Sequence, residues 1–146
     1  MNQAITAVAF IHKDGKLFTA RRAASKNFLP GKFELPGGHI EPGEDIVAGL
    51  RRELREELDG LEVIIGDPFY AFTYTNDTAG THSVEIAYFA QLKNPEGSIH
   101  LKAEDHSESA WITAVEVDRY WAGNDDERTL VERGFAILRQ GGTINV

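Results

Sequence analysis

The sequence reads Gly38-His39-Ile40-Glu41-Pro42-Gly43-Glu44 and, after seven further residues, Arg52-Glu53-Leu54-Arg55-Glu56-Glu57. Hydrophobic residues recur through this region at the spacing of one helical face, namely Ile46, Val47, Leu50, Leu54 and Leu58. This periodicity predicts a helix from Glu44 to about Asp59. Gly60 is the expected stop, because glycine readily adopts the left-handed conformation that ends helices.

Three glutamates of this helix share one face. Glu53, Glu56 and Glu57 span about 100° of arc on a helical wheel, beside the hydrophobic stripe. Carboxylates crowded at the edge of a buried face repel one another and lose solvation, so a cation is expected among them. Hard divalent cations prefer such oxygen ligands. Taken alone, the glutamates also fit a solvated face with salt bridges.

The surrounding residues favour the metal-binding interpretation. Gly49 projects into the same arc and is expected to leave space beside the carboxylates. Arg52 precedes Glu56 by four residues and can hold its carboxylate. Gly37 and Gly38 leave the backbone open to a metal or phosphate. The whole pattern fixes six residues over twenty positions, which makes chance the weaker explanation.

Most of the remaining chain reads as strands. Expected strands are 4–11, 17–20, 32–35, 63–65, 69–75, 83–92 and 109–113, with a hairpin turn at 13–16 and a hairpin loop at 76–81. A helical turn is expected at 115–120 and a closing helix at 126–139, with Leu130, Ile137 and Leu138 inward. Mixed strands and two substantial helices predict an α/β fold, a sheet between helices, in a single domain over residues 1–146.

Composition narrows the function. The net charge is −8, from 23 acidic and 15 basic residues, which disfavours duplex nucleic acid and anionic membranes as partners. Without cysteine, disulfides, thiolate zinc sites and a cysteine nucleophile are excluded. No hydrophobic run reaches the roughly 18–20 residues of a transmembrane helix. The N-terminus lacks a secretory signal, so a cytoplasmic protein is expected.

The segment 38–57 resembles the Nudix box, Gly-x5-Glu-x7-Arg-Glu-aliphatic-x-Glu-Glu-x-Gly-aliphatic. It departs only at the end, where Asp59, Gly60 and Leu61 place the final glycine and aliphatic residue one position later. The resemblance extends to residues 21–24, 35–38 and the segment around Trp111. It implies a Nudix-type α/β/α sandwich with a mixed central sheet, and hydrolysis of a nucleoside diphosphate linked to another group.

The resemblance also implies roles for individual residues. Glu53, Glu56 and Glu57 match the metal-binding glutamates, and the carbonyl of Gly37 or Gly38 often adds a ligand. Glu44 matches the glutamate that orients the helix carboxylates, with Arg52 as a further supporting residue. The expected cofactor is Mg²⁺, with Mn²⁺ as an alternative. Such cations reverse the local charge and let an acidic protein bind a phosphate substrate.

The general base is left open between two places. Some members of the family take it from the box and others from a loop, which here is 102–108. Glu104 and Asp105 are its candidates, although an exposed polar loop explains either residue equally well. His39, His82, His100 and His106 lack paired zinc spacing and are interpreted as ordinary polar residues.

The chain most resembles the MutT branch of the family, which hydrolyses nucleoside triphosphates. Arg22 matches an arginine that approaches the phosphates, and Asn27 lies where other members place a small polar contact. Asn124 matches an asparagine that reads the base, and its amide would suit the edge of 8-oxoguanine. Asn124 is equally compatible with capping the last helix.

Other substrates share the same motif. ADP-ribose, nucleotide sugars, dihydroneopterin triphosphate and dinucleoside polyphosphates are the enzymatic alternatives. A nucleotide-binding sensor module is the non-enzymatic one, although it would usually carry a broken box. The expected partner is in every case a small nucleotide-like molecule, bound by a monomer or a homodimer.

Overall fold

The computed structural model describes residues 1–26, 31–123 and 125–141. Its strands are β1 (Asn2–Lys13), β2 (Lys16–Arg22), β3 (Phe33–Glu34), β4 (Gly37–Ile40), β5 (Val63–Asn76), β6 (Thr81–Leu92) and β7 (His106–Ile112). Its helices are α1 (Ile46–Glu57), the 3-10 helix η1 (Ala114–Glu116), α2 (Val117–Tyr120) and α3 (Asp126–Arg139). Asn27 and Asn124 lie outside the described residues.

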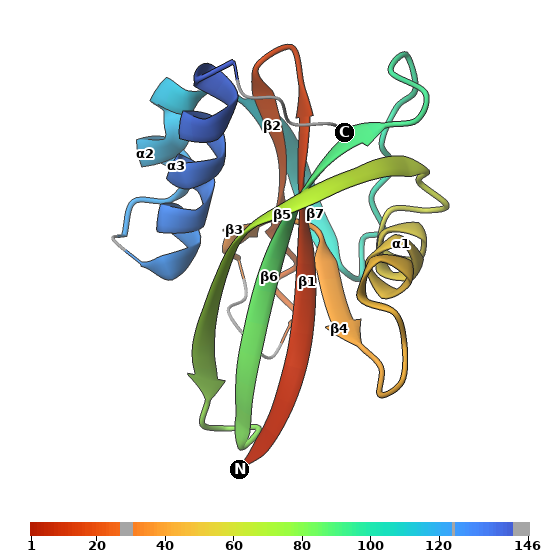
Figure 1. The fold of residues 1–146 in the computed structure, drawn as a ribbon, viewed down its shortest axis with the longest axis vertical. Coiled ribbons are helices and arrows are strands. Elements are labelled where there is room, and N and C mark those ends of the chain that lie inside the picture. Colours follow the sequence, from red (N-terminus) through yellow and green to blue (C-terminus); the bar gives the residue numbers. More distant parts are fainter. Residues whose placement is uncertain (27–30, 124, 142–146) are drawn as a thin grey trace.

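The strands form a mixed sheet with the order β3-β2-β1-β6-β5, while β4 pairs with β1 and β7 with β2. β1 and β6 run parallel, and the other pairs are antiparallel. In Figure 1, α1 lies on one side of the sheet and α2 and α3 lie on the other. This arrangement confirms the α/β/α sandwich expected from the sequence.

Alternating residues of β1 supply both halves of the core. Ala7, Ala9 and Ile11 face α1 and pack with Leu50, Leu54 and Leu58. Val8 and Phe10 face α3 and pack with Leu130, Val131 and Phe135. A strand that is buried on both faces reads as a continuous hydrophobic run, as residues 7–11 do. The sheet therefore fixes the positions of both helices.

Helix α1 begins two residues later than expected, because Asp45 is its N-cap. The Asp45 carboxylate accepts a hydrogen bond from the backbone N–H of Ala48 at 3.0 Å, which satisfies a free donor of the first turn. At the other end, Asp59 and Gly60 both have positive φ, and the N–H of Gly60 donates to the carbonyl of Arg55 at 2.7 Å. Gly60 therefore takes part in the helix end as predicted, with Asp59 sharing the left-handed conformation.

The strands differ from the prediction most at β4 and β5, and β7 begins at His106 rather than at residue 109. β4 is absent from the expected strands, but its residues pair in register with β1, from Ile5 opposite Ile40 to Val8 opposite Gly37. The two segments expected at 63–65 and 69–75 form one strand, β5, with an irregularity in its pairing around Pro68. α3 has the predicted bounds. No helix in the described part of the chain is long and apolar enough to cross a membrane.

Candidate active site

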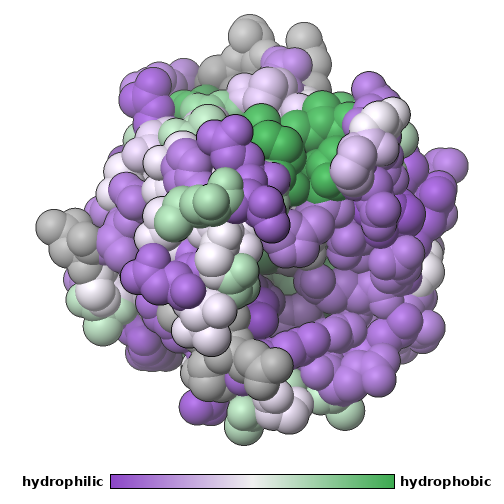
Figure 2. Space-filling model, turned by 90° about the horizontal axis from the view of Figure 1, so that it is seen from below, coloured by the Kyte–Doolittle hydropathy of each residue, from purple (hydrophilic) through white to green (hydrophobic). Residues whose placement is uncertain are grey.

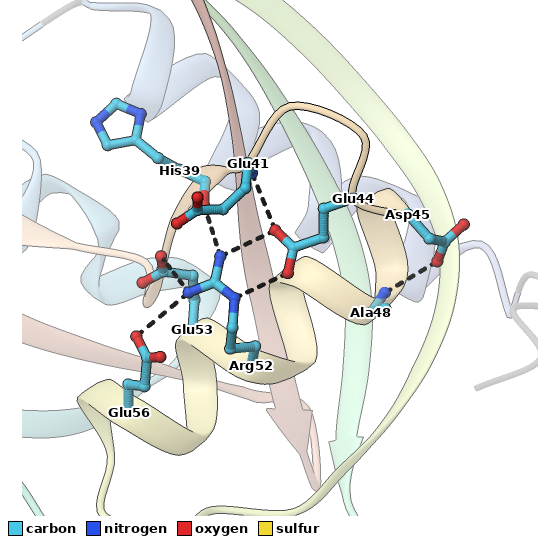
Figure 3. A network of polar contacts seen from close by, with 8 residues as sticks. All are labelled: His39, Glu41, Glu44, Asp45, Ala48, Arg52, Glu53 and Glu56. Carbon is cyan, nitrogen blue, oxygen red and sulfur yellow. Dashed lines mark hydrogen bonds and ion pairs between the residues drawn. The ribbon is translucent and has the colours of Figure 1, made fainter.

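The guanidinium of Arg52 joins the loop before α1 to two of the glutamates on the helix (Figure 3). Its Nε and Nη2 donate to both carboxylate oxygens of Glu44, at 2.8 and 3.0 Å. Its Nη1 donates to Glu53 at 3.1 Å and to Glu56 at 3.3 Å. The carbonyl of His39 accepts a further bond from Nη2 at 3.1 Å. Arg52 therefore orients the glutamates from the side, as its spacing from Glu56 predicted.

Glu44 is the anchor of this network. Its Oε1 also accepts the backbone N–H of Glu41 at 2.9 Å, which closes the loop before the helix. The hydrogen bond from Arg52 is the largest of the effects that lower the pKa of Glu44 to about 2. Glu44 is therefore a fixed anion that holds Arg52, and through it Glu53 and Glu56.

Gly37 and Gly38 bring the backbone of β4 against this network. A Cβ at position 38 would lie 2.3 Å from Oε2 of Glu53, and one at position 37 would lie 2.1 Å from the carbonyl oxygen of Ala7. No larger residue fits either position without displacing the strand or the glutamate. Gly49 has another role than predicted, because a Cβ there would meet Glu44 and Ile40, each at 2.7 Å. The space beside Gly49 is thus filled by the loop.

The three glutamates differ in exposure. The side chain of Glu56 is 61% exposed, whereas Glu53 is 20% exposed and Glu57 18%. Burial is the main cause that raises the pKa of Glu53. Burial, followed by the charge of Glu34, raises the pKa of Glu57 to about 9. The glutamates on the predicted helix face therefore range from the exposed carboxylate of Glu56 to the buried carboxyl group of Glu57.

His106 completes the enclosed end of the site, so its interpretation from the sequence as an ordinary polar residue is wrong. It is only 2% exposed, and its Nε2 lies 2.9 Å from Oε2 of Glu34 and 3.7 Å from Oε1 of Glu57. One ligand atom from each of the three residues lies within 4.8 Å of the others. The same Oε1 of Glu57 is buried and has no hydrogen-bond partner among the described residues.

Two cations lie around this end of the site. Nη1 of Arg22 donates to Oε1 of Glu34 at 3.1 Å, and Nζ of Lys26 donates to Oδ1 of Asp105 at 2.8 Å. The charge of Asp105 also contributes to the raised pKa of Glu57. Of the two predicted loop acids, Asp105 is thus beside the site, and Glu104 is exposed.

A second group of acids lies on the other face of the sheet and was missed from the sequence. Glu85 on β6 is 8% exposed, and burial raises its pKa to about 7. Glu127 is in the first turn of α3, where burial and then the charge of Glu85 raise its pKa to about 8. The indole N–H of Trp121 lies near the Glu127 carboxyl group and lowers its pKa, against the larger effects of burial and Glu85. Neither this N–H nor Oε1 of Glu127 makes a hydrogen bond within the described residues.

A comparison with known protein families identifies the class of protein to which this chain belongs. The NUDIX domain model matches residues 1–133, and the chain belongs to this family. It is accordingly a Nudix hydrolase, with the glutamates of the box brought together on α1.

Individual relatives agree with the assignment. The chain is 32% identical over 112 residues to a CTP pyrophosphohydrolase of Escherichia coli (strain K12), which covers 77% of each chain. It is 28% identical over 145 residues to the nucleoside triphosphatase NudI of Escherichia fergusonii, covering 92% of this chain and 99% of that protein. The crystal structure of a MutT protein from Methanosarcina mazei Go1 shares the fold, with a TM-score of 0.80, 21% identity and coverage of 95% and 96%.

Proposed function

We propose that the protein hydrolyses a nucleoside triphosphate to the nucleoside monophosphate and pyrophosphate, with a divalent cation bound by Glu53, Glu56 and Glu57. Glu57 carries the proposal, because its Oε1 is buried, has no hydrogen-bond partner among the described residues, and lies within reach of Glu34 and His106. A buried carboxylate of this kind is costly unless a cation neutralises it. The relatives named for CTP and nucleoside triphosphates support this choice of substrate.

The donor atoms fit a hard divalent ion. Carboxylate oxygens are the preferred ligands of Mg²⁺ and Mn²⁺, and the glycine backbone of β4 approaches Glu53 closely. When bound, such an ion supplies Lewis acidity and neutralises phosphate charge. The carbonyl of Gly37 or Gly38 remains a candidate ligand on the same side.

The chain's own residues supply positioning and proton transfer. Arg52 holds Glu53 and Glu56 in fixed orientations, and Arg22 places a positive charge at the edge of the site for the phosphates. Asp105 is our candidate for the general base, since Lys26 holds its Oδ1 by a hydrogen bond of 2.8 Å and its carboxylate lies beside the site to accept a proton from the attacking water. Water adds to one phosphorus of the anhydride, the bridging bond breaks, and the products are the monophosphate, pyrophosphate and a proton.

The test is a nucleotide screen in Mg²⁺ with the products identified by chromatography. Ribo- and deoxyribonucleoside triphosphates, 8-oxo-dGTP, ADP-ribose, nucleotide sugars, dihydroneopterin triphosphate and dinucleoside polyphosphates form the panel. Triphosphates should give monophosphate and pyrophosphate most efficiently, and Glu53→Gln should abolish this. Glu62→Gln is the control, because Glu62 pairs with Arg55 away from the site. Nucleotide binding without any product would support the sensor alternative instead.

Our narrower prediction is that the substrates are oxidised purine nucleoside triphosphates and that Asn124 reads their base. Asn124→Ala should then reduce the preference for 8-oxo-dGTP over dGTP by roughly one to two orders of magnitude, for the loss of one paired hydrogen bond. The alternative that Asn124 caps the last helix is wrong, because Asp125 is the N-cap of α3 and its carboxylate accepts the N–H of Arg128 at 2.9 Å. An unchanged preference in Asn124→Ala would contradict the base-reading role.

A further inference from the structure

Three neighbouring strands bring a buried histidine to the enclosed end of the glutamate site. His106 begins β7 and is opposite Arg22, the last residue of β2, while Glu34 ends β3 on the other side of β2. The pairing of β2 with β7 shifts between Arg21 and Arg22, which leaves Ser107 as one extra residue on β7. Irregularities of this kind re-aim side chains and are common beside active sites. In a regular pair, Ser107 rather than His106 would be opposite Arg22.

Arg22 and His106 lie toward the end of the sheet at which β1 begins. β2 runs antiparallel to β1, so its last residue points back toward the N-terminus (Figure 1). Figure 2 views the molecule from that end, where the surface is mostly hydrophilic, as the approach of a phosphate substrate requires. The side chain of Arg22 is 23% exposed, whereas that of His106 is only 1% exposed. His106 is therefore too deeply buried to contact a substrate and acts through its neighbours.

Glu34 is held through both of its carboxylate oxygens. Its Oε1 accepts Nη1 of Arg22 at 3.1 Å, and its Oε2 lies 2.9 Å from Nε2 of His106. Because Nε2 faces carboxylate oxygens of both Glu34 and Glu57, we assign the ring hydrogen to Nε2, which then donates to Glu34. The backbone N–H of His106 donates to the carbonyl of Lys102 at 2.9 Å, which fixes the start of β7. Glu34 is thus oriented by a guanidinium on one side and an imidazole on the other.

The contact between His106 and Glu57 is of a different kind. Nε2 lies 3.7 Å from Oε1 of Glu57, which is too long for a hydrogen bond. This Oε1 has no hydrogen-bond partner among the described residues, so the imidazole lies beside the oxygen without using its lone pairs. One carboxylate oxygen of Glu34 and one of Glu57 lie within 4.8 Å of each other, where like charges repel. A Glu34 that lost its bond to His106 would be free to turn toward Glu57 and disturb it.

We propose that His106 and Glu34 are positioning residues, and that the hydrogen bond between them keeps Glu34 away from Glu57 and leaves Oε1 of Glu57 available to a cation. The carboxylate of Glu34 also holds Arg22, so the metal-binding glutamate and the arginine placed for the phosphates share one support. Residues that orient the ligands of a metal in this way commonly determine its affinity. The inference deepens the proposed function and rests on it for the role of Glu57.

The test measures Mn²⁺ binding by electron paramagnetic resonance, which does not depend on turnover. His106→Gln keeps an N–H donor near the position of Nε2, whereas the shorter amide of His106→Asn cannot reach Glu34. We expect about 10- to 100-fold weaker Mn²⁺ binding in His106→Asn, as is usual for the loss of a residue that orients a metal ligand. Binding in His106→Gln should stay close to that of the wild type. His100→Gln is the control, since His100 is exposed.

A double variant separates positioning from a general loss of packing. Glu34→Gln replaces one acceptor by an amide, so either Arg22 or His106 loses its partner, and we again expect about 10- to 100-fold weaker Mn²⁺ binding. The changes Glu34→Gln and His106→Asn break the same hydrogen bond. Combined, they should therefore cost no more affinity than the more damaging change alone, because residues that share a contact are not additive.

Wild-type Mn²⁺ affinity in a folded His106→Asn variant would overturn the inference. Equal losses in the Asn and Gln variants, or losses that multiply in the double variant, would do the same. Thermal melts identify a variant of His106 that fails to fold, in which case Glu34→Gln decides, and its unchanged affinity would contradict the inference. If the wild type binds Mn²⁺ but hydrolyses no triphosphate, the proposed function fails separately, and the same titrations still decide the roles of His106 and Glu34.

Discussion

The two acidic groups of this molecule are built in opposite ways. The α1 group, Glu53, Glu56 and Glu57, is arranged around a guanidinium that contacts two of its members. The α3 group, Glu85 and Glu127, has neither member ion-paired to an Arg or Lys in the described part of the chain. Both groups contain carboxyl groups with raised pKa values, so burial affects each of them.

The difference indicates different ligands. A group of carboxylates oriented by a cation at its side is suited to hold a metal ion in fixed geometry. A buried pair without any such support has raised pKa values, because burial disfavours the charged form of each carboxyl group. We therefore expect changes in the α1 group to abolish turnover, and changes in the α3 group to alter stability and its dependence on pH.

The largest effect should follow loss of a metal-binding carboxylate. Glu53→Gln should reduce kcat/KM by more than roughly a hundredfold, because even supporting residues of metal sites cost 10- to 100-fold. The change is nearly isosteric, so the melting temperature should hold. Titration of Mn²⁺ by electron paramagnetic resonance should show weakened binding. Full activity of the Glu53→Gln variant, or full wild-type activity in excess chelator, would show that the α1 group does not bind a metal ion required for turnover.

Neutralising the general base should come next. Asp105→Asn should lower kcat by roughly 10²- to 10⁴-fold with little change in KM, since proton transfer matters in the transition state. Glu104→Gln is the matched change in the same loop, and should have little effect because Glu104 is exposed. Steady-state kinetics on both variants decide the question. Normal turnover of both variants would indicate that the general base is instead one of the glutamates of α1.

Arg52→Lys should produce an intermediate loss. Lysine keeps the charge but cannot donate to Glu44 through two nitrogens while also reaching Glu53 and Glu56. We expect a 10- to 100-fold loss of metal affinity or kcat/KM. Arg55→Lys is the control on the same helix, because Arg55 pairs with Glu62 instead. Equal behaviour of the two variants would mean that the network of Figure 3 does not position the site.

The smallest expected effect concerns stability in the α3 group. The pKa of Glu127 rises from 4.5 to about 8 in the folded protein, so the folded state holds a proton that the unfolded state releases. Its stabilising contribution is present below pH 4.5 and is lost as the pH rises toward 8. Glu127→Gln should therefore match the wild type at pH 4 and melt higher at pH 9, by about 2–4 °C per kcal/mol relieved. A difference in melting temperature between wild type and Glu127→Gln that stays the same at all pH values would show that Glu127 is not held protonated.

Periodicity and local signals predicted the helices well. α3 has the expected bounds, and its N-cap Asp125 accepts from the N–H of Arg128 at 2.9 Å. The start of α1 differed because Asp45 caps the helix with its own side chain. β4 was missed since glycine has little tendency to form strands, and only pairing with β1 makes Gly37 and Gly38 extended. Long-range pairing of this kind leaves no local signal.

The site was predictable where residues share one helix and hidden where the sheet assembles it. The wheel placed Glu53, Glu56 and Glu57 together, but Glu34 and His106 reach Glu57 from separate strands. In β6, hydrophobic residues alternate with polar ones around Val84 and Ile86, yet Ser83 and Glu85 are the more deeply buried residues. Alternation alone does not reveal the burial of Glu85, because both faces of this sheet are covered.

Hydrolysis of CTP in ¹⁸O-labelled water, with and without a chelator, decides whether the protein is a metal-dependent pyrophosphohydrolase. We expect CMP and pyrophosphate as the first products in Mg²⁺, with one labelled oxygen in only one of them, and no reaction once the metal is removed. Mass spectrometry of both products then identifies which phosphorus is attacked. Orthophosphate as the first product, or unchanged turnover in the chelator, would contradict a metal-dependent pyrophosphohydrolase built on the α1 group.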